Sequence, residues 1–418
     1  MKTDHQALFS VLLLGAVTSG QVRDVVLVSA GTDDPNWSGI FLVPGRGGPP
    51  VRLLAQPITL TNIGLLPGNR QYCTIGGGTA PYPIRVYSFD RETLQLSTVH
   101  TFPWGPASGP YRRVYSVTAD QEGDLLIAAE NGLWRSRASD NSYALEYLEN
   151  SSLHFKVLVD VDTGDYIVDM GPMRVTPAGR VSTIGGGAVP YLGSQDPASG
   201  DFLVSHGAWV LNFLFRMSPS GALTTVGPYA HVLAVDQEPS YAGAYVGIVP
   251  NSLNPFTHLR LLRLDRTAQP VTTLVDNTHT ILLPDLVLDR SLNVSTKSAG
   301  ARNRWDVLVD FPNAPWRPYA CFVGMSGFRP GLPLQDGRVL RMNLDDLTWV
   351  ALSGAFPAVF QGLLGRLDSR GAAQGRIDLN FLPPASRGTT FWLLATALDP
   401  AAPSGIAAHS DPWVVQIR

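Results

Sequence analysis

The sequence lacks most of the features that helical, disulfide-rich or nucleic-acid-binding proteins need. It has only two cysteines, Cys73 and Cys321, in 418 residues, which excludes a disulfide-rich scaffold. A single bridge between them is one alternative, although we expect two buried free thiols. Apolar residues at helical spacing are almost absent, so we expect few helices. The net charge is −3 and no basic stripe is present, which argues against nucleic-acid binding.

Familiar catalytic motifs are also missing. No HExxH segment occurs, the segment around Ser326 departs from G-x-S-x-G at Phe328, and neither glycine triplet is followed by Gly-Lys-Ser/Thr. The triplets stand in two similar phrases, TIGGGTAPY (74–82) and TIGGGAVPY (183–191). We interpret these phrases as exposed loops that open on one face, each carrying a Pro-Tyr pair, rather than as phosphate-binding loops.

The N-terminus has the pattern of an export signal. The apolar run Ala7–Val17 follows Lys2 and precedes the small residues Thr18–Gly20. That run is too short to span a bilayer, and no later segment is long enough to do so. We expect residues 1–20 to be a signal peptide of a secreted, surface-held or periplasmic protein; a buried first strand is the alternative.

Glycine and proline, by contrast, are abundant. The chain has 41 Gly and 33 Pro, while 44% of its residues are hydrophobic and only 16% are charged. This composition predicts a folded chain of many short strands joined by turns. The length suits two domains.

A hairpin phrase recurs along much of the chain. Each copy is an apolar strand, a polar or glycine-rich turn and a second strand, as in MRVTPAGRVSTI from Met173. The turn centres fall near residues 45, 90, 138, 178, 220 and 266, which is a spacing of about 44 residues. A second hairpin phrase, with Asp and Gly at its turn, begins at Val114, Val157, Tyr191 and Val232, and a partial copy begins at Asp285.

Two hairpins per repeat give four strands, which is the content of a β-propeller blade. We expect residues 21–312 to form six or seven blades, and we favour seven. The first repeat lacks an innermost strand of its own, so a strand near Ile281–Asp289 would complete it and close the ring.

The blade pattern stops at NAPWRP (313–318), which we interpret as a linker. Residues 319–418 contain other strands. One of them, GRIDLNF, alternates so that Ile377, Leu379 and Phe381 share one face. The prediction is an all-β chain: a six- or seven-bladed β-propeller followed by a small β-sandwich.

Two resemblances add to this reading. Two repeat segments resemble NHL-type and streptogramin-lyase-like propellers, within the superfamily that includes gluconolactonases. They are DTGDYIV…MRVTPAGRVSTI and DPASGDFLV…FRMSPSGALTTV. That resemblance covers residues 22–312 and implies the fold more than an activity, since such propellers include lyases, lactonases and binding modules. Residues 319–418 resemble a C-terminal β-domain of exported proteins of environmental bacteria, which implies an attachment, sorting or stability role. The matching segments are YACFVGMSGFRPGLPL, GLLGRLDSRGAAQGRIDL and AHSDPWVVQI.

One rim of the propeller is the expected binding site. In this fold the turns between second and third strands open on the same face as the loops that enter each innermost strand. The first kind of connection holds Glu130, Asn131, Asp169 and His206, and the second holds Arg112, Arg113, His154, His231 and His279. Aromatic residues in or near these loops are Trp37, Tyr82, Tyr191, Trp209 and Tyr229. Such a rim predicts binding of a small molecule, a sugar, or a peptide or protein.

Two functions are compatible with this rim. The first is an exported, monomeric binding or scaffold protein without catalysis. The alternative is a lyase or a lactonase-like hydrolase in which His206, His231 and Glu130 act with or without a divalent cation, Ca²⁺ or Mg²⁺. The resemblance to gluconolactonases implies calcium held by Glu, Asn and Asp, with which Glu130, Asn131 and Asp285 are loosely compatible.

The segment VDVDTGDYIVD also suggests a calcium site, because it contains Asp160, Asp162, Asp165 and Asp169. However, Asp165 stands where an EF-hand loop requires glycine, and no Glu closes the loop. We therefore favour a hairpin turn in which Asp and Gly have conformational roles.

Overall fold

The computed structural model describes two compact units. One comprises Arg23–Asp236 and Ala242–Asp289, here the N-terminal unit, and the other contains Arg290–Arg418, the C-terminal unit. The described residues are 24–31, 38–45, 48–55, 60–66, 71–76, 84–102, 114–120, 123–129, 132–137, 145–149, 156–169, 173–184, 191–196, 199–206, 213–227, 232–235, 245–250, 259–265, 267, 269–276, 281–288, 292–296 and 303–417. Among them, no helix is both long enough and apolar enough to cross a membrane.

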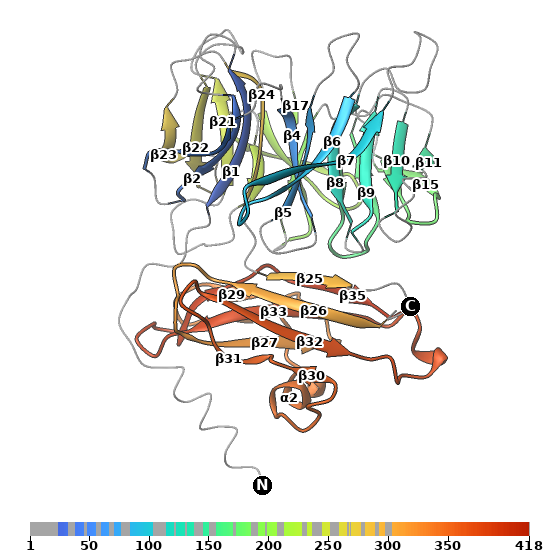
Figure 1. Cartoon of the computed structure of the whole chain (residues 1–418), viewed down its shortest axis with the longest axis vertical. Helices are drawn as coiled ribbons and strands as arrows, with labels where there is room; N and C mark the ends of the chain where they lie inside the picture. Colours follow the sequence, from blue (N-terminus) through green and yellow to red (C-terminus); the bar gives the residue numbers. More distant parts are fainter. Residues whose placement is uncertain are drawn as a thin grey trace. The chain divides into compact units, whose positions relative to one another are not determined.

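The described part of the N-terminal unit consists of small antiparallel sheets of four strands (Figure 1). We number them 1 to 6 in chain order and write each from its first to its fourth strand. Sheet 1 consists of β24 (Ile281–Leu288), β1 (Val25–Gly31), β2 (Gly39–Val43) and β3 (Val51–Ala55), and sheet 2 of β4 (Leu60–Leu65), β5 (Gln71–Gly76), β6 (Ile84–Asp90) and β7 (Gln95–Phe102). Sheet 3 consists of β8 (Val114–Ala119), β9 (Leu125–Ala129), β10 (Gly132–Ser136) and β11 (Leu145–Glu149), and sheet 4 of β12 (Val157–Val159), β13 (Tyr166–Val168), β14 (Met173–Val175) and β15 (Val181–Thr183). Sheet 5 consists of β16 (Tyr191–Gln195), β17 (Phe202–His206), β18 (Phe213–Met217) and β19 (Leu223–Gly227), and sheet 6 of β20 (Val232–Val235), β21 (Tyr245–Pro250), β22 (Leu259–Leu264) and β23 (Pro270–Asp276).

The hairpin phrases of the sequence correspond to real strand pairs. Five of the six predicted turn centres lie between the third and fourth strands of a sheet, and the sixth, residue 90, is the last residue of the third strand of sheet 2. The four full copies of the second phrase form the pairs β8–β9, β12–β13, β16–β17 and β20–β21. The sequence analysis did not include the pair β4–β5, whose turn contains Gly68 but lacks the Asp of the other copies.

Sheet 1 combines strands from the two ends of the unit. β24 pairs with β1, with Val25 opposite Leu288 and Gly31 opposite Ile281. The expected strand near Ile281–Asp289 is therefore present and completes the first sheet. The first strands also contact one another in order: β4 contacts β8, β8 contacts β12, β12 contacts β16, β16 contacts β20, β20 contacts β24, and β24 contacts β4.

Separate apolar clusters lie between neighbouring sheets. One cluster packs Ile40 of sheet 1 against Tyr72 and Phe89 of sheet 2, and similar clusters join sheets 2 and 3, 3 and 4, and 4 and 5. A further cluster joins sheet 6 to sheet 1, through Val246 and Leu286 among others. Burial between sheets is the main favourable contribution to the stability of such a unit.

The C-terminal unit has two main sheets. Their strands are β25 (Leu292–Thr296), β26 (Arg304–Asp310), β32 (Ala372–Asp378) and β30 (Phe360–Gln361) in one, and β31 (Leu364–Arg366), β27 (Pro318–Gly324), β33 (Thr390–Leu398), β34 (Ile406–His409) and β35 (Trp413–Gln416) in the other. A small hairpin, β28 (Leu332–Pro333) and β29 (Val339–Leu340), the helix α2 (Asp346–Leu352) and the 3-10 helix η4 (Pro384–Ser386) complete it. One core, including Trp305, Cys321 and Leu393, draws on both sheets, which is the arrangement of a β-sandwich.

The structure corrects four expectations about this region. The unit begins at Arg290 rather than after residue 312, because β26 pairs with β32 along its whole length. The partial copy at Asp285 is no hairpin, since its second half, β25, pairs with β26. The segment 313–318 is the turn between β26 and β27, not a linker between domains. In GRIDLNF, Ile377 and Leu379 are buried, but Phe381 lies beyond β32 and is 67% exposed.

Both cysteines are buried thiols, one in each unit, and no disulfide joins them. Cys73 lies on β5 and Cys321 on β27. Burial raises the pKa of the Cys321 thiol to about 12, so this thiol is protonated and unreactive at neutral pH. The prediction of two buried thiols is confirmed.

The pairing of β24 with β1 predicts a specific loss of stability. Leu286 of β24 is 1% exposed and packs in the cluster between sheets 6 and 1. Leu286→Ala should lower the free energy of unfolding by about 2–5 kcal/mol, because it leaves a cavity where the first and last strands of the N-terminal unit pair. Urea denaturation followed by circular dichroism measures this change. Leu223→Ala, at a position 43% exposed on β19, should change it by less than about 0.5 kcal/mol; equal effects of the two variants contradict the expectation.

A buried histidine predicts acid sensitivity of the C-terminal unit. His409 is 7% exposed, and burial lowers its pKa to about 4. The unfolded chain takes up a proton below about pH 6.5 while the folded chain does not, so the free energy of unfolding should fall from pH 6.5 to 4 by up to about 3 kcal/mol. Asp336, Asp345 and Asp368 have lowered pKa values, so their contributions are lost below that window. His409→Gln should flatten the pH dependence of the unfolding midpoint between pH 6.5 and 4; an unchanged slope refutes the assignment.

Candidate functional site

Strand pairing divides the connections of the N-terminal unit between two ends. At one end, the start of each first strand lies opposite the finish of the second strand: Val114 pairs with Ala129, and Tyr191 with Ser205. We call this the mouth end. The first-to-second and third-to-fourth strand turns lie at the other end, here the turn end. The two TIGGG phrases begin where β5 and β15 end, and both strand ends lie at the mouth end. Residues 77–83 and 185–190, which come next, lie outside the described residues.

Most of the predicted site residues lie outside the described residues. These are Arg112, Arg113, Glu130, Asn131, His154, His231, His279 and Tyr82, together with Trp37, Trp209 and Tyr229. The backbone of three others is described, without their side chains: Asp285 lies within β24, Tyr191 opens β16 and His206 closes β17. Because Tyr191 pairs with Ser205, these last two residues reach the same end of sheet 5.

Asp169 is the one predicted rim residue whose side chain is described. It directly follows the second strand of sheet 4 and is 0% exposed, and its Oδ1 accepts a hydrogen bond from the Lys156 amide at 3.1 Å. The amide of Asp169 donates to the Lys156 carbonyl at 3.4 Å. This carboxylate therefore ties the start of β12 to the end of β13 and is not presented to solvent.

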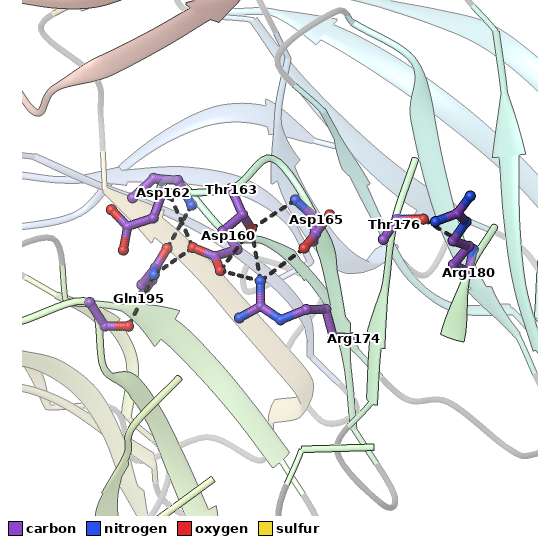
Figure 2. A network of polar contacts seen from close by, with 10 residues as sticks. Asp160, Asp162, Thr163, Asp165, Arg174, Thr176, Arg180 and Gln195 are labelled. Atoms are coloured by element: carbon purple, nitrogen blue, oxygen red, sulfur yellow. Dashed lines mark hydrogen bonds and ion pairs between the residues drawn. The ribbon is translucent and has the colours of Figure 1, made fainter. Parts of the chain in front are cut away.

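At the turn end, carboxylates are bound by the protein itself. In sheet 4, Arg174 of β14 contacts Asp160 at 2.7 Å and Asp165 at 3.0 Å (Figure 2). Asp160 also accepts hydrogen bonds from the Asp162 amide and the Thr163 hydroxyl, each at 3.0 Å. These bonds close the β12–β13 turn, in which Gly164 adopts a φ of +74° that favours glycine.

Contacts at this end also connect neighbouring sheets. Gln195 of sheet 5 donates from Nε2 to Asp160 of sheet 4 at 2.9 Å, and its Oε1 accepts from the Val161 amide at 2.7 Å (Figure 2). Between sheets 3 and 4, the Tyr166 hydroxyl donates to Asp120 at 3.0 Å. The turn aspartates therefore hold their own turn and anchor the next sheet.

The ion pair of sheet 4 has a counterpart in sheet 5. There, Arg216 of β18 contacts Asp196 at 3.1 Å and Asp201 at 4.0 Å. In the register, Arg216 lies opposite Leu203 as Arg174 lies opposite Ile167. Sequence reasoning identified the aspartates but missed their arginine partners. The signal was available: in each case an arginine on the third strand follows an Asp that ends the first.

The local pKa values follow from this burial and pairing. Burial and the neighbouring Asp120 carboxylate raise the pKa of Tyr166, so its hydroxyl stays protonated as a donor. Burial alone would lower the pKa of Arg174, but its hydrogen bonds to Asp165 and Asp160 outweigh that effect and raise it. Both groups are therefore fixed in the charge state that their contacts need.

The hydrogen bonds confirm the interpretation of VDVDTGDYIVD as a turn. Asp160 and Asp165 share a guanidinium, and Asp169 lies at the opposite end of the sheet. The carboxylates of this segment are thus separated or already paired. Within the described residues, no group of three or more His, Cys, Asp or Glu side chains has the geometry of a metal site.

Comparisons with known proteins give likeness in structure only. Neither the protein families nor the curated proteins include a match to this sequence. Solved structures of β-propeller-like proteins do match. TolB from Acinetobacter baumannii has 12% identity and a TM-score of 0.49, over 68% of this chain and 69% of its own. An auxiliary nutrient binding protein from Bacteroides thetaiotaomicron has 13% identity and a TM-score of 0.39, over 69% and 74% of the two chains. A chain of a nidogen/laminin complex has 8% identity and a TM-score of 0.46, over 63% and 99%.

The Asp–Arg contacts predict a large stability effect at the turn end. Arg174→Leu leaves the buried Asp160 carboxylate without its cation, which should cost about 3–5 kcal/mol in free energy of unfolding. The double variant Arg174→Leu/Asp160→Asn should recover part of that loss, because the unpaired charge is gone. Denaturant unfolding measures four proteins: the unaltered chain, the single variants Arg174→Leu and Asp160→Asn, and the double variant. Strict additivity of the two single changes, or a change of the unfolding midpoint of the unaltered protein on adding Ca²⁺, contradicts a purely structural role.

Proposed function

We propose that this chain is an exported binding protein built on a six-bladed, closed β-propeller, and that its mouth end binds a sugar or a peptide. The contacts between first strands carry the proposal, since they run in order from β4 to β24 and back to β4. In a ring of this kind, the mouth-end loops surround a central channel. Loops on a rigid scaffold are where binding residues concentrate.

The chemistry of the two ends supports this choice. At the turn end, Arg174 pairs with Asp160 and Asp165, and Arg216 pairs with Asp196 and Asp201, so these four carboxylates are not available to a ligand. The mouth end receives Tyr191 and His206 on sheet 5 and, in the sequence, the Pro-Tyr pair that ends at Tyr82. Tyrosines offer a flat apolar ring with a hydroxyl, which suits both sugar and peptide ligands.

Binding assays on the purified full chain test this function. A glycan array and a peptide library should identify a ligand whose dissociation constant rises at least about 10-fold, which is about 1.4 kcal/mol, in Tyr82→Ala/Tyr191→Ala. Arg180→Ala, an exposed position on the β14–β15 turn, is the matched control and should bind normally. A ligand affected equally by both variants, or no ligand on either array, rejects the mouth-end proposal. Conversion of the bound ligand, lost in His206→Ala, would instead support the enzymatic alternative.

A further inference from the structure

The C-terminal unit carries an exposed aromatic and cationic surface that the proposed function does not use. It consists of Trp316, Leu364, Arg366 and Arg370, which we call the Trp316 surface. Trp316 is 62% exposed and Leu364 is 48% exposed. Arg366 and Arg370 are exposed as well. Exposed apolar side chains that lie together and are bordered by charged residues mark interaction sites, whereas single exposed ones do not.

Two neighbouring turns bring these residues together. The Trp316 amide donates to the Asp368 carbonyl at 3.2 Å, and the Leu367 amide donates to the Arg317 carbonyl at 2.9 Å. Pro318 pairs with Arg366, and Ala320 with Leu364, in the β27–β31 ladder. Because Leu364 and Arg366 are two residues apart on a strand, their side chains leave the same face of the sheet.

The backbone at this place is fixed. Trp316 has a φ of 63°, in the left-handed region that is unfavourable for a large side chain. Hydrogen bonds hold it there: Ala314 N to Phe311 O at 2.8 Å, Arg317 N to Ala314 O at 3.2 Å, and Phe311 N to Gly371 O at 2.8 Å. Gly371 is required, since a Cβ there would lie 2.1 Å from the Phe311 carbonyl oxygen. The indole is thus presented on a rigid turn, which lowers the entropy cost of binding.

The charges of the surface leave the Arg366 guanidinium open to a partner, while the charge of Arg370 acts on the neighbouring Asp368 carboxylate. The Asp368 carboxylate accepts bonds from the amides of Arg370 and Ala372 at 2.8 and 2.9 Å. Arg317, beside the surface, pairs with Asp399 at 2.9 Å. Arg366 makes no side-chain hydrogen bond or ion pair to any described residue. A ligand carboxylate can therefore bind Arg366 without breaking an internal pair.

We propose that the Trp316 surface binds an acidic polysaccharide whose sugars carry carboxylates. The indole ring would cover the apolar C–H face of one sugar ring, and the guanidinium groups would form paired hydrogen bonds to the carboxylates of that ring or its neighbour. Side chains half exposed on turns suit a polymer lying across them, whereas small-molecule sites enclose most of their ligand. The surface has one aromatic ring and two arginines, and two positive charges are too few for tight binding to nucleic acid.

Polygalacturonate, a polymer of hexuronate, is the probe that tests this proposal. The full chain should bind it in affinity electrophoresis and calorimetry, with weaker binding at 0.5 M salt than at 0.05 M, and it should not bind neutral dextran. Trp316→Gly should weaken binding at least about 10-fold, because the ring is lost while glycine keeps the positive φ without strain. Arg366→Gln should weaken it several-fold.

Matched variants separate this site from general effects. Phe381→Ala removes another aromatic ring, 67% exposed on the same unit, and should leave binding unchanged, as should Arg180→Ala at an exposed position of the N-terminal unit. Unfolding midpoints of Trp316→Gly should equal or exceed those of the unaltered chain. Absence of polygalacturonate binding overturns the proposal, and so does binding that survives Trp316→Gly. Equal binding of polyglutamate, insensitive to Trp316, would show recognition of charge alone and also overturn it.

Discussion

The pairing of β24 with β1 is the interaction on which the N-terminal unit depends. It places Val25 opposite Leu288, so the first and last strands of the unit belong to one sheet. Without it, β1 would be an edge strand and sheet 6 would have no neighbour beyond β24, so the cluster that joins Val246 to Leu286 would be open to water. This pairing has the largest sequence separation of any in the unit. Such contacts form late, because the chain pays loop-closure entropy before they contribute.

At the turn end, side-chain contacts of buried aspartates hold neighbouring sheets of the N-terminal unit together. Two of the turn aspartates have two tasks each. Asp160 holds Arg174 within its sheet and Gln195 of the next. Asp120 accepts from the Asp124 amide within its own turn and from Tyr166 of the next sheet. A buried carboxylate is costly unless it is fully paired, so these groups specify one arrangement of neighbouring sheets. That satisfied chemistry is a reason to look for ligand binding at the other end.

The sequence predicted the strand pairs well where a local signal existed. Turn residues such as Gly164 and Asp160 mark the hairpins, because a positive φ or an Asp-capped turn needs those residue types. The boundary between units was predicted wrongly for a physical reason. β25 and β26 alternate like blade strands, and alternation shows that a strand has a buried face but not which sheet it joins. The proline-rich turn at 313–318 looked like a linker because turns and linkers share a composition.

For the sites, the limits of the sequence are of two kinds. Asp169 was expected at an open rim, yet its carboxylate is buried against the Lys156 amide; polarity alone does not show which way a side chain points. Trp316 is the opposite case, because the sequence analysis did not select it and the structure exposes it. In the sequence, nothing distinguishes it from the other eight of the nine tryptophans. Its φ of 63° is visible only in the folded structure. Strain of this kind persists only where the surroundings impose it. Here a mainly buried residue type is held outward, beside an arginine that has no partner among the described residues, so burial does not explain its position.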